Sequence, residues 1–314
     1  MQIGIVHTTS STTCGCAAAI ARGVEALGWT SLILDCEDAV QDPGLLNECS
    51  VIFDHTDTFR GSGALRPFVR FVLASHGYCV VGSDAQVCIM CDHKIHAKDI
   101  LTHAGIPVPN GFFYRGGAID HPSDLRFPMI AKCGYEHMSR AMRVVDKKEE
   151  LESILKAMYS EVSQPIIVEE MVGTRELEVG VIADGDGGTM VLPFMEWVPP
   201  EGRGAVFTYA RKQVGGSTCV SAELPDDAAD RLKKLALSAF HALNIRDYCR
   251  FDVRFKDDGS LYFLEANVIP NMEEDDGMAR AALAAGIEYP ALIERLVRSA
   301  IERMRRCGRV GKYE

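Results

Sequence analysis

The sequence predicts an α/β protein with more than one domain. Its 314 residues exceed the usual length of a single domain, which is about 100–200 residues. Over the first 90 residues, short apolar runs rich in β-branched residues alternate with helical patterns, which is typical of a parallel sheet covered on both faces. Near the C-terminus, Asp257, Asp258 and Gly259 separate two strand patterns and predict a β-hairpin.

The first predicted region, residues 1–91, has helices over 14–27 and 65–75 that Gly28 and Gly77 terminate. Its four strands read "QIGIVH", "WTSLILD", "SVIFDH" and "YCVVGS". In parallel sheets, ligands bind where loops leave the carboxyl ends of the strands. The loops "HTTSSTTCG" and "HTDTFRGSG" occupy that position, so the candidate substrate contacts there are His7, Ser10 and His55.

A second region is predicted over residues 92–172 and a third over 173–314. The second opens with a helix that has Asp92 as its N-cap and Gly105 just beyond its end. An edge-type stretch, "IPVPNGFFY", follows, and then the strands "FPMIAK", "AMRVV" and "PIIVEEMV" with a helix over 149–158. The third region contains strands "ELEVGVIA" and "TMVLPF", a helix over 225–243, the hairpin and a closing helix over 289–307.

Composition excludes several classes of protein. The net charge of −11 argues against a nucleic-acid surface, and no apolar run approaches the ~20 residues of a membrane span. The start of the chain lacks the features of a secretory signal, so a cytoplasmic location is expected. The eleven cysteines lie scattered in apolar segments and are predicted to be structural in a reducing cytosol. The close pairs Cys14/Cys16 and Cys88/Cys91 are weak signals for zinc or redox chemistry.

The hairpin carries the most informative chemistry. Period-two alternation places Arg250 and Asp252 on one face of its first strand, and Glu265 and Asn267 on one face of its second. Pairing across the turn is predicted to bring Asp252 close to Glu265. Such all-oxygen sets suit Mg²⁺, which takes phosphate oxygens as further ligands. The alternative is a solvated hairpin face that carries ion pairs.

Other parts of a nucleotide site occur in order along the chain, and together they resemble a known family. They are Lys94, Lys132, "VEEMVG" and Lys212 before a glycine pair. The chain resembles ATP-grasp enzymes and is most similar to the D-alanine–D-alanine ligases, on the segments "DHKIHAKDILTHAGIPVP", "IVEEMVGTRELEVGV", "GSTCVSAELPDD" and "RFDVRF…FLEAN". The resemblance implies an ATP-grasp fold, in which an N-terminal Rossmann-like parallel sheet precedes two α+β subdomains that sandwich ATP.

The resemblance implies ATP and two Mg²⁺ ions as cofactors, with Mn²⁺ as a substitute. The metal ligands would be Asp252, Glu265 and Asn267, with Glu265 bridging the two ions. Lys94 and Lys132 would contact the α- and β-phosphates.

The resemblance also assigns the remaining nucleotide and catalytic contacts. Ser139 would lie in the phosphate-covering loop, Lys212 would contact the terminal phosphates, and Arg250 would stabilise the acyl-phosphate and the tetrahedral intermediate. Glu176 would bind the ribose hydroxyls. Adenine would meet the backbone of four consecutive residues: Glu169, Glu170, Met171 and Val172. Small-molecule carboxylate and amine substrates are implied, and relatives suggest a homodimer.

The chain departs from this family at its substrate loops. The turn after Asn267 reads Pro-Asn-Met, with Asn271 where the family has glycine, and four carboxylates follow over 273–276. Asp276 replaces a serine of the stretch that holds the second amino acid's carboxylate. The acids either complement a helix dipole or favour an amine that lacks a carboxylate or is itself cationic. The first loop lacks the family's glutamate, because no acid precedes Glu25.

Three hypotheses follow. The first is an ATP-dependent carboxylate–amine ligase that forms an amide through an acyl-phosphate, in specialised small-molecule biosynthesis. The second is a D-alanine–D-alanine ligase of cell-wall synthesis. The third is a nucleotide-binding protein that has lost catalysis, against which the complete set Arg250, Asp252, Glu265 and Asn267 argues.

Overall fold

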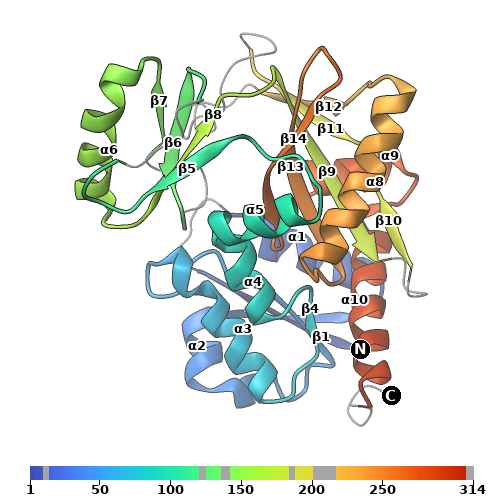
Figure 1. Cartoon of the computed structure of the whole chain (residues 1–314). Helices are drawn as coiled ribbons and strands as arrows, with labels where there is room; N and C mark the ends of the chain where they lie inside the picture. The colour runs from blue at the N-terminus through green and yellow to red at the C-terminus, as the bar shows by residue number, and fades with distance from the viewer. Residues whose placement is uncertain (10–13, 120–124, 136–141, 184–187, 201–216, 309–314) are drawn as a thin grey trace.

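The structure is a computed structural model that describes residues 1–9, 14–119, 125–135, 142–183, 188–200 and 217–308. Three sheets follow one another along the chain (Figure 1). Helices accompany each sheet, which confirms the predicted α/β class. No helix in the described ranges is long and apolar enough to cross a membrane.

The first sheet is parallel, as predicted, and has the order β2-β1-β3-β4. Its strands are β1 (Gln2–His7), β2 (Thr30–Asp35), β3 (Val51–His55) and β4 (Val80–Val81). The helices of this part are α1 (Cys16–Ala26), α2 (Cys36–Gln41), α3 (Arg66–Ser75) and α4 (Ala85–Asp92), with short 3-10 turns at Pro43–Leu46 and Gly63–Leu65. The sheet brings the ends of β1 and β3 together, since His7 is the register partner of His55.

The second sheet is antiparallel, with the order β5-β8-β6-β7. Its strands are β5 (Gly111–Tyr114), β6 (Met129–Cys133), β7 (Arg143–Val145) and β8 (Ile166–Glu170). β5 lies at an edge, as its preceding prolines predicted. Helix α5 (Lys94–His103) precedes this sheet, and α6 (Lys148–Val162) packs on it through Leu151, Leu155 and Met158.

The third sheet has the order β12-β11-β9-β13-β14, with β10 paired to β9. Its strands are β9 (Arg175–Ala183), β10 (Thr189–Val191), β11 (Met195–Val198), β12 (Thr218–Ser221), β13 (Tyr248–Phe255) and β14 (Leu261–Asn267). The helices α8 (Asp226–Ala242), α9 (Gly277–Ala284) and α10 (Tyr289–Arg306) complete the chain.

The C-terminal helix returns to the beginning of the chain. The apolar face of α10, which includes Leu292, Leu296 and Ala300, shares one core with Ile20 and Val24 of α1. Figure 1 shows α10 running from the third sheet down beside the first. This packing holds the loop before α1 next to the segment that follows β14.

One predicted helix boundary is wrong. Asp92 does not cap α5, because it is the last residue of α4, and His93 is the N-cap of α5 instead. The Asp92 carboxylate is buried and accepts two hydrogen bonds from the guanidinium of Arg66. A short capping residue is a local signal, so it could not reveal this pairing with a helix 26 residues away.

Candidate active site

The hairpin of β13 and β14 places two carboxylates and an amide side by side. Asp252 is the register partner of Glu265, which confirms the predicted pairing. The register shifts after Asp252, and the side chain of Asn267 donates a hydrogen bond from Nδ2 to Asp252 Oδ2 at 3.2 Å. Phe251 and Phe263 pack edge to face in the core and join the two strands.

Arg250 lies at the centre of an acidic group. Its Nε is 2.8 Å from Asp252 Oδ1, and its Nη1 is 3.1 Å from Oε1 of Glu178 on the neighbouring strand β9. Burial lowers the pKa of Arg250, but the carboxylates of Asp252 and Glu178 outweigh burial and raise it well above its usual value. The guanidinium is therefore a permanent cation in a largely buried place.

Both acids beside Arg250 have raised pKa values. Burial raises the pKa of Asp252 to about 6; Arg250 opposes this shift and Glu265 adds to it. Burial also raises the pKa of Glu178 to about 7, with Arg250 opposing and Asp252 and Asp276 adding. Burial is thus the main cause of both upward shifts, and the neighbouring carboxylates add to it.

Two lysines of α5 lie on the same side of that helix, one turn apart, and reach the second and third sheets. Lys94 Nζ is 2.8 Å from Glu265 Oε2, and Lys98 Nζ is 2.6 Å from Glu169 Oε1. The other oxygen of Glu169 is 2.8 Å from the Nζ of Lys132, so this buried carboxylate joins two ammonium groups. Lys98 was not among the predicted site residues, although it follows Lys94 by four residues and therefore lies on the same face of the helix.

This lysine–carboxylate triad has shifted pKa values. Burial lowers the pKa of Lys98 to about 8, against the opposing attraction of Glu169. For Lys132, burial also lowers the pKa, but Glu169 and Glu265 outweigh it and the net shift is upward. Burial raises the pKa of Glu169, and the two lysines outweigh that effect, so its net pKa is lowered.

The stretch expected to read adenine has few free N–H groups. Glu170 donates its N–H to the carbonyl of Asn110 at 2.8 Å, and Met171 donates to that of Pro128 at 3.0 Å. Val172 follows them directly in an irregular segment. Glu176, the residue expected at the ribose, lies at the start of β9 and pairs with Arg254 at 2.8 Å.

The four successive acids have structural partners. The N–H of Gly15, the N-cap of α1, donates to Glu273 Oε1 at 2.9 Å, and Arg22 on that helix pairs with Glu274 at 2.9 Å. Asp276 is the N-cap of α9 and accepts from the N–H of Gly277. The acids therefore lie at the N-termini of two helices, as the dipole interpretation predicts. The sequence indicated α9, which follows the acids directly, but it could not indicate α1.

Asn271 is also held by the protein. Its Oδ1 accepts hydrogen bonds from the Cys16 thiol at 2.9 Å and from the N–H of Glu273 at 2.8 Å. The substrate roles predicted for Asn271 and Asp276 stay predictions, now with these internal partners.

The candidate residues of the first sheet gather at the carboxyl ends of β1 and β3. Burial lowers the pKa of His7, and Asp35 opposes this. His55 is only 2% exposed, and it lies with Cys14 and Cys16 in a cluster whose ligand atoms are within 4.8 Å of one another. All eleven cysteines are free and nine are buried; Cys14 is half-buried and packs against the core, and Cys307 is exposed.

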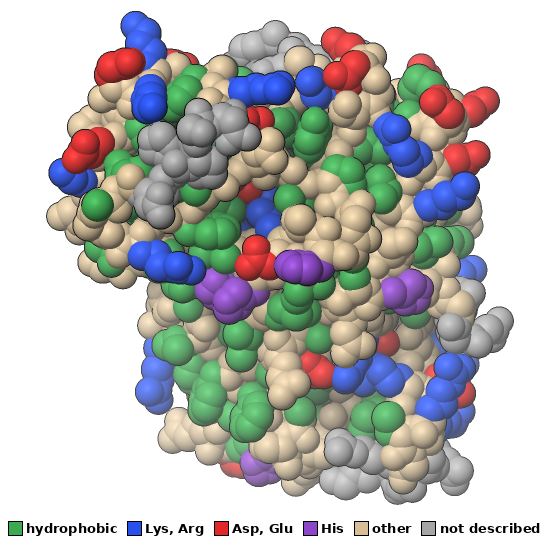
Figure 2. Space-filling model, in the orientation of Figure 1, with side chains coloured by type: hydrophobic (Ala, Val, Ile, Leu, Met, Phe, Trp, Pro, Cys, Tyr) green, Lys and Arg blue, Asp and Glu red, His purple; other side chains and the backbone are tan. Residues whose placement is uncertain are grey.

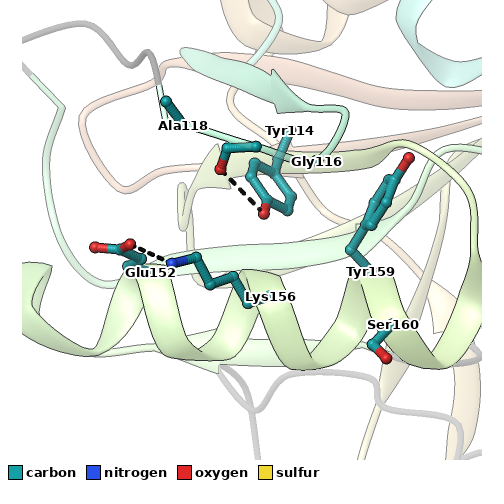
Figure 3. A pocket seen from close by; sticks show the side chains of 8 residues that line it. Tyr114, Gly116, Ala118, Glu152, Lys156, Tyr159 and Ser160 are labelled. Carbon is teal, nitrogen blue, oxygen red and sulfur yellow. Dashed lines mark hydrogen bonds and ion pairs between the residues drawn. The ribbon is translucent and has the colours of Figure 1, made fainter.

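Three predicted site residues, Ser10, Ser139 and Lys212, lie outside the described residues. Figure 2 shows acidic and basic side chains together in a hollow between the lobe of α6 and the rest of the molecule. A separate hollow of about 650 Å³ on the α6 lobe is lined by Tyr114, Gly116, Gly117, Ala118, Glu152, Lys156, Tyr159 and Ser160 (Figure 3). None of the predicted site residues lines it.

Comparisons with known proteins identify the family of the chain. Residues 100–298 match the family model "D-ala D-ala ligase C-terminus". A D-alanine–D-alanine ligase of Desulforudis audaxviator is 30% identical over 241 residues, covering 75% of this chain and 77% of the relative. One of Nitratidesulfovibrio vulgaris is 30% identical over 287 residues, covering 88% and 90%.

The fold also matches a solved structure of this kind. A crystal structure of D-alanine–D-alanine ligase from Bacillus anthracis complexed with ATP has a TM-score of 0.79 at 21% identity, covering 98% of this chain and 100% of that one. The chain therefore belongs to the D-alanine–D-alanine ligase family, a family of ATP-dependent C–N ligases with the ATP-grasp fold.

Proposed function

We propose that this protein joins a carboxylate to an amine through an acyl-phosphate, with release of ADP and phosphate. The observation that carries the proposal is the meeting of Arg250, Asp252, Glu265 and Asn267 on one hairpin face beside Lys94. Binding of a nucleotide alone would not require this set. Transfer of a phosphoryl group requires positioned positive charge and hard oxygen ligands, which this set supplies.

The residues fit a magnesium site. Asp252 and Glu265 are register partners, and the pKa of the buried Asp252 is raised partly by repulsion from Glu265. A divalent cation between them would relieve this repulsion, and Asn267 adds a neutral oxygen. Bound Mg²⁺ would neutralise charge on the phosphates during transfer. Asp252, Glu265 and Asn267 would together hold two Mg²⁺ ions.

The side chains around the hairpin then have separate tasks. Lys94 and Lys132 would bind the α- and β-phosphates, and Glu169 holds the Lys132 ammonium in place. Glu176, which is held by its ion pair with Arg254, would bind the ribose hydroxyls. Because Glu170 and Met171 already donate their N–H groups, adenine would use the N–H of Val172 and carbonyl groups of the 169–172 stretch.

The reaction has two balanced steps. An oxygen of the substrate carboxylate attacks the γ-phosphorus, the bond to the bridging oxygen breaks, and ADP leaves. The amine then attacks the acyl carbon, loses a proton, and expels phosphate as the amide forms. Arg250 would stabilise the negative charge that develops on the acyl oxygen, because its cation is permanent and held by Asp252 and Glu178.

The surroundings of Arg250 support an amine substrate that lacks a carboxylate. Glu178 is buried, and its Oε2 has no hydrogen-bond partner among the described residues. This oxygen lies against Gly277, where a Cβ would collide with it, and Asp276 is the adjoining residue. A substrate carboxylate there would be repelled by Asp276 and, above the Glu178 pKa of about 7, by Glu178 as well, whereas a cationic group would be attracted. This difference from the cell-wall ligases is our reason for proposing a role in specialised small-molecule biosynthesis.

The test is release of ADP with Mg²⁺ and ATP in the presence of carboxylates and amines, singly and in pairs. We expect release only with pairs, and higher kcat/KM for diamines than for α-amino acids. Assayed above the Glu178 pKa of about 7, Glu178→Gln should shift that preference toward amino acids by about tenfold or more, because it removes one buried negative charge. Glu274→Gln is the matched control, because Glu274 is exposed and pairs with Arg22.

The second candidate is a D-alanine–D-alanine ligase, which the relatives favour by their names. Release of ADP with D-alanine alone, at a rate unaffected by added amines, would establish this candidate and overturn the first. Silence of the native protein with every pair, despite binding of ATP, would support the non-catalytic alternative. A homodimer and a cytoplasmic location stay predictions.

A further inference from the structure

A second group of ligand-type side chains lies at the first sheet. Cys14 and Cys16 flank Gly15 at the start of α1, and His55 ends β3. One ligand atom from each of the three residues lies within 4.8 Å of the others. Nδ1 of His55 is buried and has no hydrogen-bond partner among the described residues. A buried imidazole nitrogen without a partner is costly unless something binds it.

We infer that Cys14, Cys16 and His55 form a binding site for a thiophilic divalent cation, with Zn²⁺ as the best match. Two thiolates and one neutral imidazole carry a charge of −2, which a divalent ion offsets. Zinc sites of this composition with three protein ligands keep a fourth position open for water or a substrate group. Each thiol releases one proton on binding.

The spacing of the three atoms allows this with little rearrangement. Zn–S bonds are about 2.3 Å and Zn–N bonds about 2.0–2.1 Å long, so ligand atoms around one tetrahedral ion lie about 3.5–3.8 Å apart. In the structure the three ligand atoms lie within 4.8 Å of one another, so they would have to approach one another by at most roughly 1 Å to bind one ion. Cys14 precedes α1 and is half-buried at the edge of the core, so a shift of its side chain displaces fewer neighbours than a shift of the buried Cys16 or His55 would.

Groups next to Cys16 could hydrogen-bond to it when it acts as a metal ligand. The N–H of Met272 donates to the Cys16 sulfur at 3.3 Å, an interaction that also stabilises a thiolate. The Cys16 thiol now donates to Asn271 Oδ1, and its proton would leave when the metal binds. Asn271 and Met272 follow β14 by only a few residues, so the inferred ion would lie beside the segment that leads from the candidate magnesium site.

The two sites would select different metals. The hairpin offers carboxylate and amide oxygens, which suit Mg²⁺, whereas sulfur and imidazole ligands suit Zn²⁺. The open position would let the zinc bind a Lewis-basic group of a substrate, such as a carboxylate, at the carboxyl ends of β1 and β3. The metal assignment rests on the cluster alone and does not depend on the proposed ligase reaction.

The test uses Co²⁺ as a spectroscopic probe of the full chain, purified with chelator and reductant. We expect one equivalent to bind per chain, with thiolate-to-metal absorption in the near ultraviolet and the visible bands of tetrahedral Co²⁺. Excess Zn²⁺ should displace it, and excess Mg²⁺ should not. Equilibrium dialysis with Zn²⁺ measures the same stoichiometry without relying on enzyme activity.

Variants assign the signal to residues. Cys14→Ser and His55→Gln should each weaken Co²⁺ binding at least tenfold. Two control variants should bind Co²⁺ as the native protein does: Cys307→Ser, and Cys88→Ser from the other close cysteine pair. Circular dichroism checks folding, and the half-buried Cys14 is the variant least expected to perturb the core. Absence of the thiolate band in the native protein, or a band unchanged in Cys14→Ser, would overturn the inference. A Cys14–Cys16 disulfide formed in place of Co²⁺ binding under reducing conditions would also overturn it.

Discussion

Glu273 accepts a hydrogen bond from the backbone N–H of Gly15 at 2.9 Å, although 258 residues separate them. The carboxylate thus lies at the N-terminus of α1, where the helix dipole and the free N–H groups favour negative charge. Its neighbour Glu274 pairs with Arg22 on the same helix. The segment after β14 is therefore joined to the start of α1, where Cys14 and Cys16 lie.

Replacing Glu273 is expected to weaken this junction. Glu273→Ala should lower the free energy of unfolding by about 1–2 kcal/mol, because α1 loses an acceptor and a favourable charge. Glu274→Ala is the control, and it should cost less than about 0.5 kcal/mol because its ion pair is exposed. Urea unfolding measures both values, and equal losses would contradict the role given to Glu273.

Asp252→Asn is expected to reduce turnover by at least about 10²-fold while the fold persists, because it removes charge from the metal and phosphate site at nearly constant volume. Asp257→Asn, in the turn of the same hairpin, is the matched control and should retain activity. Release of ADP measures turnover, and thermal melting checks the fold. Turnover within tenfold of the native rate would rule out a metal role for Asp252.

Removing the charge of Glu169 is expected to destabilise the protein strongly. Glu169→Gln leaves the ammonium groups of Lys98 and Lys132 without their shared carboxylate, at a cost of about 3–5 kcal/mol. Glu170→Gln should cost less than about 0.5 kcal/mol, because the amide oxygen of glutamine can still accept from the N–H of Arg126. Urea denaturation of the pair distinguishes the buried charge from its neighbour, and similar midpoints would refute the triad.

The raised pKa of Glu178 predicts a dependence of stability on pH. The folded carboxyl keeps its proton up to about pH 7, whereas the unfolded one loses it near 4.5, so the folded state binds more protons between these values. The free energy of unfolding should therefore fall as pH rises through this window. Relative to Glu178→Gln, the native protein should lose up to about 3 kcal/mol of stability between pH 4.5 and 7.

Unfolding of both proteins at several pH values provides the measurement. The comparison cancels the contribution of titrating groups that do not interact with Glu178, whereas Asp252, which does interact with it, contributes to the measured difference. A stability difference that stays constant from pH 4.5 to 7 would show that Glu178 ionises normally in the folded protein.

The sequence by itself determined many of the elements and the hairpin chemistry, but not the helices α2 and α4 or the strands β11 and β12. Apolar alternation and the Asp-Asp-Gly turn are local, and period two decides which side chains share a strand face. For that reason the parallel first sheet, the edge position of β5 and the pairing of Asp252 with Glu265 could all be predicted. The resemblance to ATP-grasp ligases rested on the same local segments.

Only the tertiary structure decided which side chains from distant parts of the sequence meet. The ion pairs of Glu169 with Lys98 and Lys132 join a helix to two strands, and the contact of Glu273 with Gly15 depends on the packing of α10 against α1. The burial of Glu178 and the gathering of Cys14, Cys16 and His55 arise in the same way. Local spacing sets the direction of a side chain, but its partner and its dielectric surroundings depend on how distant elements pack.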